Sequence, residues 1–273
     1  MAKARRTVEI FLSLGTTAAL LSSALGSAAL ANGQHQQPVD RHGHWLAEGG
    51  EGGEGGEGGE AHHQPAVNSS VDLLVVLAQM QGHLLVAQDL LGMKEFQAAE
   101  PHVGHPIDEL YGAIAPALAE RGIPPFLSTL EALRQQVRLD PGASSTLAKL
   151  QQAQARIGSV ERALQAAAGG NGTAPEVVQG LVQSAVSEYE GAVAQGQIVE
   201  VIEYQDARGF LKQAQQILQQ ARQQAQQQPG RDPSRLVAMA QVITTMLEAF
   251  PSVLPPKRAL QSPEALKALA GRL

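Results

Sequence analysis

Residues 68–92 read NSSVDLLVVLAQMQGHLLVAQDLLG, and this stretch decides the fold class. The Asn-Ser-Ser triplet at its start offers side-chain oxygens that can cap a helix, and Gly92 is a typical residue at the end of one. Between them, apolar residues recur at helical spacing and form one stripe: Leu73, Val76, Leu77, Met80, Leu84, Ala87 and Leu91. The stretch therefore predicts a long helix that packs this stripe against a core.

The same spacing continues to the end of the chain, divided by prolines and glycines. A second helix is expected to start over 93–99, with interruptions at Pro101, Gly104 and Pro106. Further helices are expected over 106–120, 127–139, 144–168, 174–194, 197–227 and 233–250, with a last one from Pro263. Because no stretch alternates apolar and polar residues as a strand does, residues 69–273 are predicted to form an all-α domain. Its expected architecture is an antiparallel helical bundle of about six to eight helices.

The first 31 residues have the features of a secretory signal peptide. Three basic residues precede a stretch over 10–30 that is rich in apolar and small residues. Ala29-Leu30-Ala31 fits a cleavage site, so the mature chain is expected to begin at Asn32; the alternative is a retained membrane anchor. No other segment has the roughly 20 uninterrupted apolar residues of a spanning helix. We therefore expect a soluble periplasmic or secreted protein, without membrane insertion after signal cleavage.

Residues 32–68 form a predicted linker rich in histidine, glycine and glutamate. Residues 49–60 are four Gly-Gly-Glu repeats. Such a segment has too few large apolar side chains to offset its ordering entropy, so we expect it to be disordered. Five histidines flank the repeats: His35, His42, His44, His62 and His63. They either bind Cu(II), Ni(II) or Zn(II) loosely or serve only as solubilising residues of a spacer.

Composition excludes several classes of function. The chain has no cysteine, which excludes iron–sulfur clusters, c-type haem attachment and zinc sites with thiolate ligands. Its formal net charge of −6 argues against nucleic acid as a partner, because that requires clustered lysine and arginine. The sequence has no Ser/His/Asp set, Gly-rich phosphate loop or His-Glu-x-x-His helix. We therefore predict that the protein is not an enzyme.

The placement of histidine is the strongest functional signal. All eight histidines lie at positions 35–105, and those in the predicted domain are His83, His102 and His105. His83 falls inside the apolar stripe, where the alternative to a metal ligand is a single core histidine bonded to a neighbouring polar group. If their stretch is helical, His102, His105 and Glu109 share one side at i, i+3 and i+7; otherwise the histidines lie in a loop that enters the next helix. The alternative to ligation is a turn that these two histidines merely cap and solvate.

Two acids of later helices lie on or beside apolar stripes. Glu188 is on the inner stripe of the helix expected over 174–194, and Glu203 borders the stripe of the next one. With the histidines, this arrangement resembles the layout of di-metal carboxylate bundles, although no predicted helix carries their Glu-x-x-His motif. The alternative is that these acids form ordinary inter-helix salt bridges together with Asp206 and Arg208.

Gly104-His105 followed by Asp108 partly resembles the Gly-x-His-x-x-Glu motif of imelysin-type periplasmic iron-uptake domains, which are exported and all-helical. In this chain glycine directly precedes the histidine, and Asp108 stands where the motif has glutamate. The resemblance is confined to these residues, and no site residue is carried over from it.

Histidine with carboxylate is the usual ligand set for iron, copper(II) and zinc, so the sequence predicts a transition-metal site. The predicted ligands of one shared centre are His83, His102, His105, Glu109, Glu188 and Glu203. A shared centre requires His83 and His105 to lie within about 8 Å of each other or to have an acid between them. The predicted function is transition-metal binding, storage or delivery by an exported protein. The alternative is a non-catalytic helical scaffold that binds another cell-envelope protein.

Overall fold

The computed structural model describes residues 67–167, 171–227 and 232–273. The predicted signal peptide, over 1–31, lies outside the described residues. So does nearly all of the predicted linker over 32–68, together with its five histidines.

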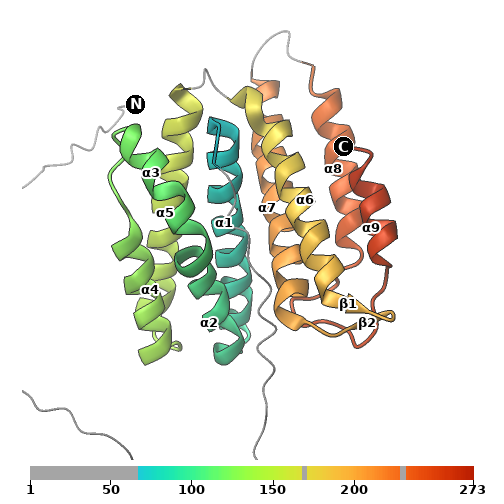
Figure 1. The fold of residues 1–273 in the computed structure, drawn as a ribbon, viewed down its shortest axis with the longest axis horizontal. Coiled ribbons are helices and arrows are strands. Elements are labelled where there is room, and N and C mark those ends of the chain that lie inside the picture. Colours follow the sequence, from blue (N-terminus) through green and yellow to red (C-terminus); the bar gives the residue numbers. More distant parts are fainter. Residues whose placement is uncertain (1–66, 168–170, 228–231) are drawn as a thin grey trace, which may run out of the picture. The chain divides into compact units, whose positions relative to one another are not determined.

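The described residues form an all-α helical bundle, as the sequence predicts (Figure 1). Its elements are α1 (Ser70–Gly92), α2 (Phe96–His105), η1 (Pro106–Tyr111), α3 (Gly112–Glu120), α4 (Leu127–Leu139), α5 (Ser144–Ala167), η2 (Asn171–Thr173), α6 (Ala174–Ala192), β1 (Val193–Ala194), β2 (Gln197–Ile198), α7 (Val201–Gln226), α8 (Ser234–Leu247) and α9 (Pro263–Ala270). The α2–η1–α3 stretch is continuous. If this stretch is counted as one helix and the single turn η2 is left out, the described residues form eight helical segments, which is within the predicted range.

α1 is the central helix of the bundle and contacts α2, α5, α6 and α7. The Ser69 hydroxyl caps its first turn by accepting a hydrogen bond from the Asp72 N–H, at 3.1 Å. The helix is buried on more sides than the predicted stripe implies, because Leu74, Ala78 and Val86 are enclosed as well. By length and composition alone α1 could cross a membrane, but most of this helix is buried inside the bundle.

The helix that begins at Phe96 is not interrupted, which corrects the breaks predicted at Pro101, Gly104 and Pro106. Pro106 lacks the N–H that an α-helix uses, and there the chain widens into the π-helical segment η1. The wider turn takes in the proline without ending the helix. His105 and Glu109 consequently lie one turn apart on the same side of it.

α6 and α7 are joined by a short hairpin, where the sequence predicts two helices, over 174–194 and 197–227, with a break of two residues. β1 pairs antiparallel with β2, with Val193 opposite Ile198. The two turn residues, Gln195 and Gly196, have φ angles of 52° and 72°, as a tight two-residue turn requires. The helices predicted over 174–194 and 197–227 are therefore shorter at this junction, and the hairpin folds α7 back antiparallel to α6.

α1 and α7 approach each other closely at two glycines. A Cβ added to Gly82 would lie 2.7 Å from Cδ1 of Phe210, and one added to Gly209 would lie 2.6 Å from the Gly82 carbonyl oxygen. Both distances are shorter than van der Waals contact, so only glycine fits in this packing. The close approach brings His83, next to Gly82, against the N-terminal part of α7.

Candidate metal centre

Three histidines from two helices converge on one aspartate of a third. Nδ1 of His83 (α1) and Nδ1 of His102 (α2) lie 2.7 and 2.8 Å from Oδ1 of Asp206 (α7). Nδ1 of His105 (α2) lies 3.2 Å from the other oxygen, Oδ2. The rings of His83 and His105 are 5.0 Å apart between centroids with Asp206 beside both, which meets the distance condition for a shared centre. We call these four residues the three-histidine centre.

The three-histidine centre lies inside the bundle. His83 and Asp206 are each 3% exposed and His102 is fully buried, while His105 is partly exposed. Polar groups at such depth require partners, and each of these side chains finds one only in the others or in neighbouring polar side chains. The centre is therefore a buried hydrogen-bonded network that links Asp206 to histidines more than 100 residues away in the sequence.

The hydrogen bond to Gln205 determines the protonation of the His102 ring: Nε2 carries the proton, and Nδ1 faces Asp206 with its lone pair. The Gln205 amide N–H donates to the Val253 carbonyl at 3.1 Å, which leaves its Oε1 to face His102 Nε2 at 2.8 Å. Oε1 only accepts, so His102 must carry its proton on Nε2. The Nδ1 lone pair then faces a carboxylate oxygen at 2.8 Å, and a second proton or a metal ion must lie between them. A ligating histidine whose other N–H is held by a neighbour is the usual arrangement in metal sites.

The surrounding imidazoles stabilise the ionised form of Asp206. Burial alone would raise its pKa, but the charges of His83 and His102 and hydrogen bonds from the imidazoles outweigh burial and lower the pKa well below its usual range. Burial lowers the pKa of His83. Burial also opposes protonation of His105, yet Asp206, Glu109 and Glu188 together raise the pKa of that ring. Asp206 is thus an ionised carboxylate with three imidazoles around it.

The predicted acids border the three-histidine centre. Glu109 Oε1 lies 3.7 Å from Nε2 of His105. Burial and the nearby charges of Asp206, Glu203 and Glu109 raise the pKa of Glu188 to about 8. Glu203 has a buried carboxylate oxygen, Oε2, that has no hydrogen-bond partner among the described residues. The ligand atoms that lie within 4.8 Å of one another belong to His83, His102, His105 and Asp206, and none of these three acids is among them.

Sequence reasoning missed two residues of the site. Asp206 was expected only among the acids that form inter-helix salt bridges with residues such as Arg208. In the structure, Arg208 pairs instead with Asp89 at 2.7 Å. Gln205 was not expected at all. The signal that could have found Asp206 is its position three residues after Glu203, on the same helix face.

The residues present fit a transition metal. One ligand atom from each member of the three-histidine centre lies within 4.8 Å of the others. Metal–nitrogen and metal–oxygen bonds of about 2.1 Å place neighbouring ligand atoms a little over 3 Å apart, so small side-chain movements suffice. Nδ1 of His105 is buried and lies 3.2 Å from Oδ2 of Asp206. Three imidazoles and a carboxylate suit iron, zinc or copper(II).

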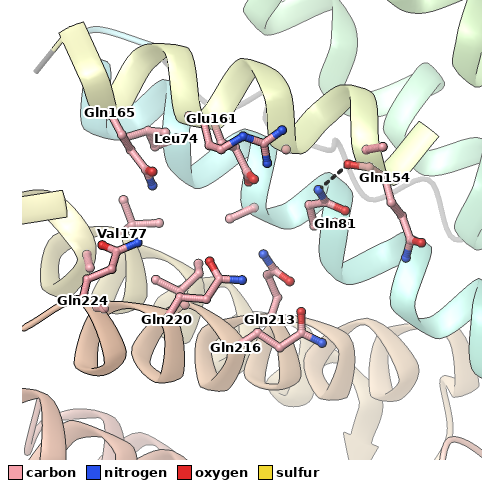
Figure 2. A pocket seen from close by; sticks show the side chains of 17 residues that line it. Leu74, Gln81, Gln154, Glu161, Gln165, Val177, Gln213, Gln216, Gln220 and Gln224 are labelled. Carbon is pink, nitrogen blue, oxygen red and sulfur yellow. Dashed lines mark hydrogen bonds between the residues drawn. The ribbon is translucent and has the colours of Figure 1, made fainter. Parts of the chain in front are cut away.

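The bundle also contains a cavity of about 400 Å³ that shares no residue with the three-histidine centre. It lies between α5 and α7 beside α1, and glutamines line much of it (Figure 2). Glu161 lines this cavity, and burial raises its pKa to about 7. No histidine lines this cavity, and the group of described residues that could hold a metal ion is the three-histidine centre.

One protein family matches part of the chain. The iron permease-associated 4-helix bundle domain matches residues 165–273, which include α6 to α9. The matched region contributes Asp206, Gln205 and the acids Glu188 and Glu203, while the three histidines precede it. Searches of curated proteins and of solved structures give no match. Residues 165–273 are thus similar to an iron permease-associated helical domain, and the three histidines lie outside this match.

Proposed function

We propose that this chain is an exported, soluble protein that binds a transition metal at the three-histidine centre and stores or delivers it without catalysing a reaction. The observation that carries the proposal is the convergence of His83, His102 and His105 on Asp206. Three imidazoles around one carboxylate support a metal site because transition metals favour this donor set, and Gln205 orients one of the rings as the hydrogen-bond partner of a ligating histidine does.

Iron is the metal that we propose. The donor set accepts iron, zinc or copper(II), and the family match favours the first because its description names an iron permease. Export from the cytoplasm rests on the signal-like residues 1–31. Because residues 165–273 are similar to an iron permease-associated domain, we propose that the chain delivers the metal to a partner in the cell envelope.

A helical scaffold that binds another envelope protein is the second candidate. Large apolar side chains are exposed around the hairpin, at Val199 and Val201. Leu260 is exposed next to a segment that bonds to the same hairpin. Metal analysis of protein isolated from its native compartment separates the two functions, because a pure scaffold would be isolated without metal.

The test of the metal site is a melting curve of the full chain with and without Fe²⁺ under anaerobic conditions. At a free metal concentration about 100 times the Kd, binding to the folded state alone adds roughly 2.7 kcal/mol, a rise of about 5–10 °C in Tm. We expect His83→Ala, His105→Ala and Asp206→Asn each to abolish this rise. His62→Ala and Asp89→Asn are the matched controls and should retain it. A rise of equal size in all five variants would refute the site.

A further inference from the structure

The cavity between α5 and α7 is lined by polar side chains whose formal charges cancel. These are seven glutamines, one carboxylate (Glu161) and one guanidinium (Arg162), and no aromatic residue lines the cavity. Its volume of about 400 Å³ is at the small end of the range of small-molecule pockets. Ligands that bind by stacking on aromatic rings, such as nucleobases and sugars, find no ring here. The cavity therefore suits a small polar molecule without net charge.

Gly158 opens the wall of the cavity where the two charged side chains meet. A Cβ added there would lie 3.4 Å from Nη1 of Arg162, 3.7 Å from Nε2 of Gln81 and 3.9 Å from Oε2 of Glu161. A guanidinium, an amide and a carboxylate thus lie around one point at the cavity wall. Glycine weakens the interior of a helix, but at this position in α5 its missing side chain leaves room between these groups.

Neither charged side chain forms a salt bridge in the described part of the chain, although Glu161 and Arg162 follow each other in α5. Burial raises the pKa of Glu161 to about 7, so this carboxyl group ionises near neutral pH. A carboxylate in such a place gains by pairing with a cationic group of a ligand, and the guanidinium gains by pairing with an anionic one.

Amides of α7 face these charges across the cavity. Gln213, Gln220 and Gln224 point from α7 towards α5 (Figure 2). Gln213 is 8% exposed, and its side chain forms no hydrogen bond with the other residues that line the cavity. Buried amides need hydrogen-bond partners, and each amide can both donate and accept. A polar ligand would supply these partners.

We propose that the cavity binds a small zwitterion, a free amino acid with a polar side chain, with its ammonium group at Glu161, its carboxylate at Arg162 and its side chain among the glutamines of α7. A zwitterion satisfies both charges, whereas an amine would leave Arg162 unpaired and a carboxylic acid would leave Glu161 unpaired. The cavity shares no residue with the three-histidine centre, so the inference goes beyond the proposed function and does not depend on it.

The experiment is saturation-transfer difference NMR of the full chain with a mixture of the standard L-amino acids, followed by titration with L-glutamine, whose amide can pair with those of α7. We expect L-glutamine to bind. Glutaramate lacks the ammonium group and 4-aminobutanamide lacks the carboxylate, so each should bind at least about tenfold more weakly through loss of a charged hydrogen bond. Affinity for L-glutamine should rise as pH is raised through 7, because Glu161 ionises while Arg162, the other charged group of the lining, stays charged.

Three variants separate binding from folding. Glu161→Gln and Arg162→Gln should each weaken binding of L-glutamine by about tenfold or more, and Glu161→Gln should also remove the pH dependence. Gly158→Ala should weaken binding because its methyl group fills the point between the charged side chains. Its melting temperature should not fall, since the added Cβ makes only ordinary contacts and alanine favours a helix. Lys149→Gln, on α5 but outside the cavity lining, is the control and should bind as wild type does.

Binding of L-glutamine that all three variants retain would overturn the site, and so would equal affinity for glutaramate or for 4-aminobutanamide. No signal from any amino acid would overturn it as well. The Fe²⁺-dependent rise in Tm tests the proposed function by itself, so either one can fail while the other stands.

Discussion

At the scale of single residues, Gln205 and Asp206 are adjacent in the sequence but act on opposite sides of one ring. Gln205 accepts a hydrogen bond from His102 Nε2, and Asp206 faces Nδ1 of the same imidazole. The backbone carbonyl of Val253 holds the Gln205 amide in place. The orientation of the His102 ring therefore depends on a residue outside the three-histidine centre.

Glu161 gives the clearest pH dependence. Burial raises its pKa to about 7, from the ordinary 4.5 of the unfolded chain, so the folded state binds more protons between these values. The stability of the wild type should therefore fall as pH rises from 4.5 through 7. We expect Glu161→Gln, which cannot ionise, to melt at a higher temperature than wild type at pH 8 and to lose this advantage at pH 4.5. Equal differences in Tm at both pH values would contradict the prediction.

At the scale of elements, the crossing of α1 and α7 sets the geometry of the three-histidine centre. Gly209→Ala would place a Cβ 2.6 Å from the Gly82 carbonyl oxygen and force the two helices apart. Overpacking of this kind costs about 1–3 kcal/mol, so we expect Tm to fall by several degrees. Metal affinity should fall as well, because His83 and Asp206 would separate. Gly92→Ala, at the open end of α1, is the control, with no atom within 4 Å of the added Cβ. Unchanged metal affinity in Gly209→Ala would refute the link between crossing and site.

Helical periodicity predicted most of these elements, because the apolar residues that define it are those that pack in the core. Leu127–Leu139 has the predicted bounds, and α1 ends at Gly92 as expected. The continuous helix through Pro106 could not be predicted, since proline ordinarily breaks an α-helix and nothing local indicates a π turn. Asp206 was hidden for a different reason. Its role depends on histidines more than 100 residues away, so only the tertiary fold distinguishes it from a surface salt-bridge partner.

At the scale of the whole molecule, the three-histidine centre joins two parts of the chain that lie far apart in the sequence. The histidines come from α1 and α2, and Asp206, Glu188 and Glu203 come from the region that matches the iron permease-associated domain. Neither part holds a complete ligand set. Bound metal should therefore tie the two parts together and raise the stability of the domain as one unit.

The linker predicted over 32–68 lies outside the described residues, and its role stays a prediction. We expect deletion of residues 32–66 to change Tm by less than about 2 °C, because the segment has almost nothing to bury. The same deletion should reduce the number of weakly bound Cu(II) or Zn(II) ions seen by titration. An unfolded product would refute the linker interpretation. An unchanged number of weak ions would show that its histidines only solubilise a spacer.

The central claim is that His83, His102, His105 and Asp206 hold one metal ion together. The most direct measurement is anomalous diffraction at the zinc edge from crystals of the full chain loaded with Zn²⁺ as a stand-in. The account predicts a strong peak in the centre of the bundle, about 2.1 Å from nitrogens of the three histidines and close to Asp206. Imidazoles still hydrogen-bonded directly to Asp206, with zinc found only elsewhere on the chain, would contradict it.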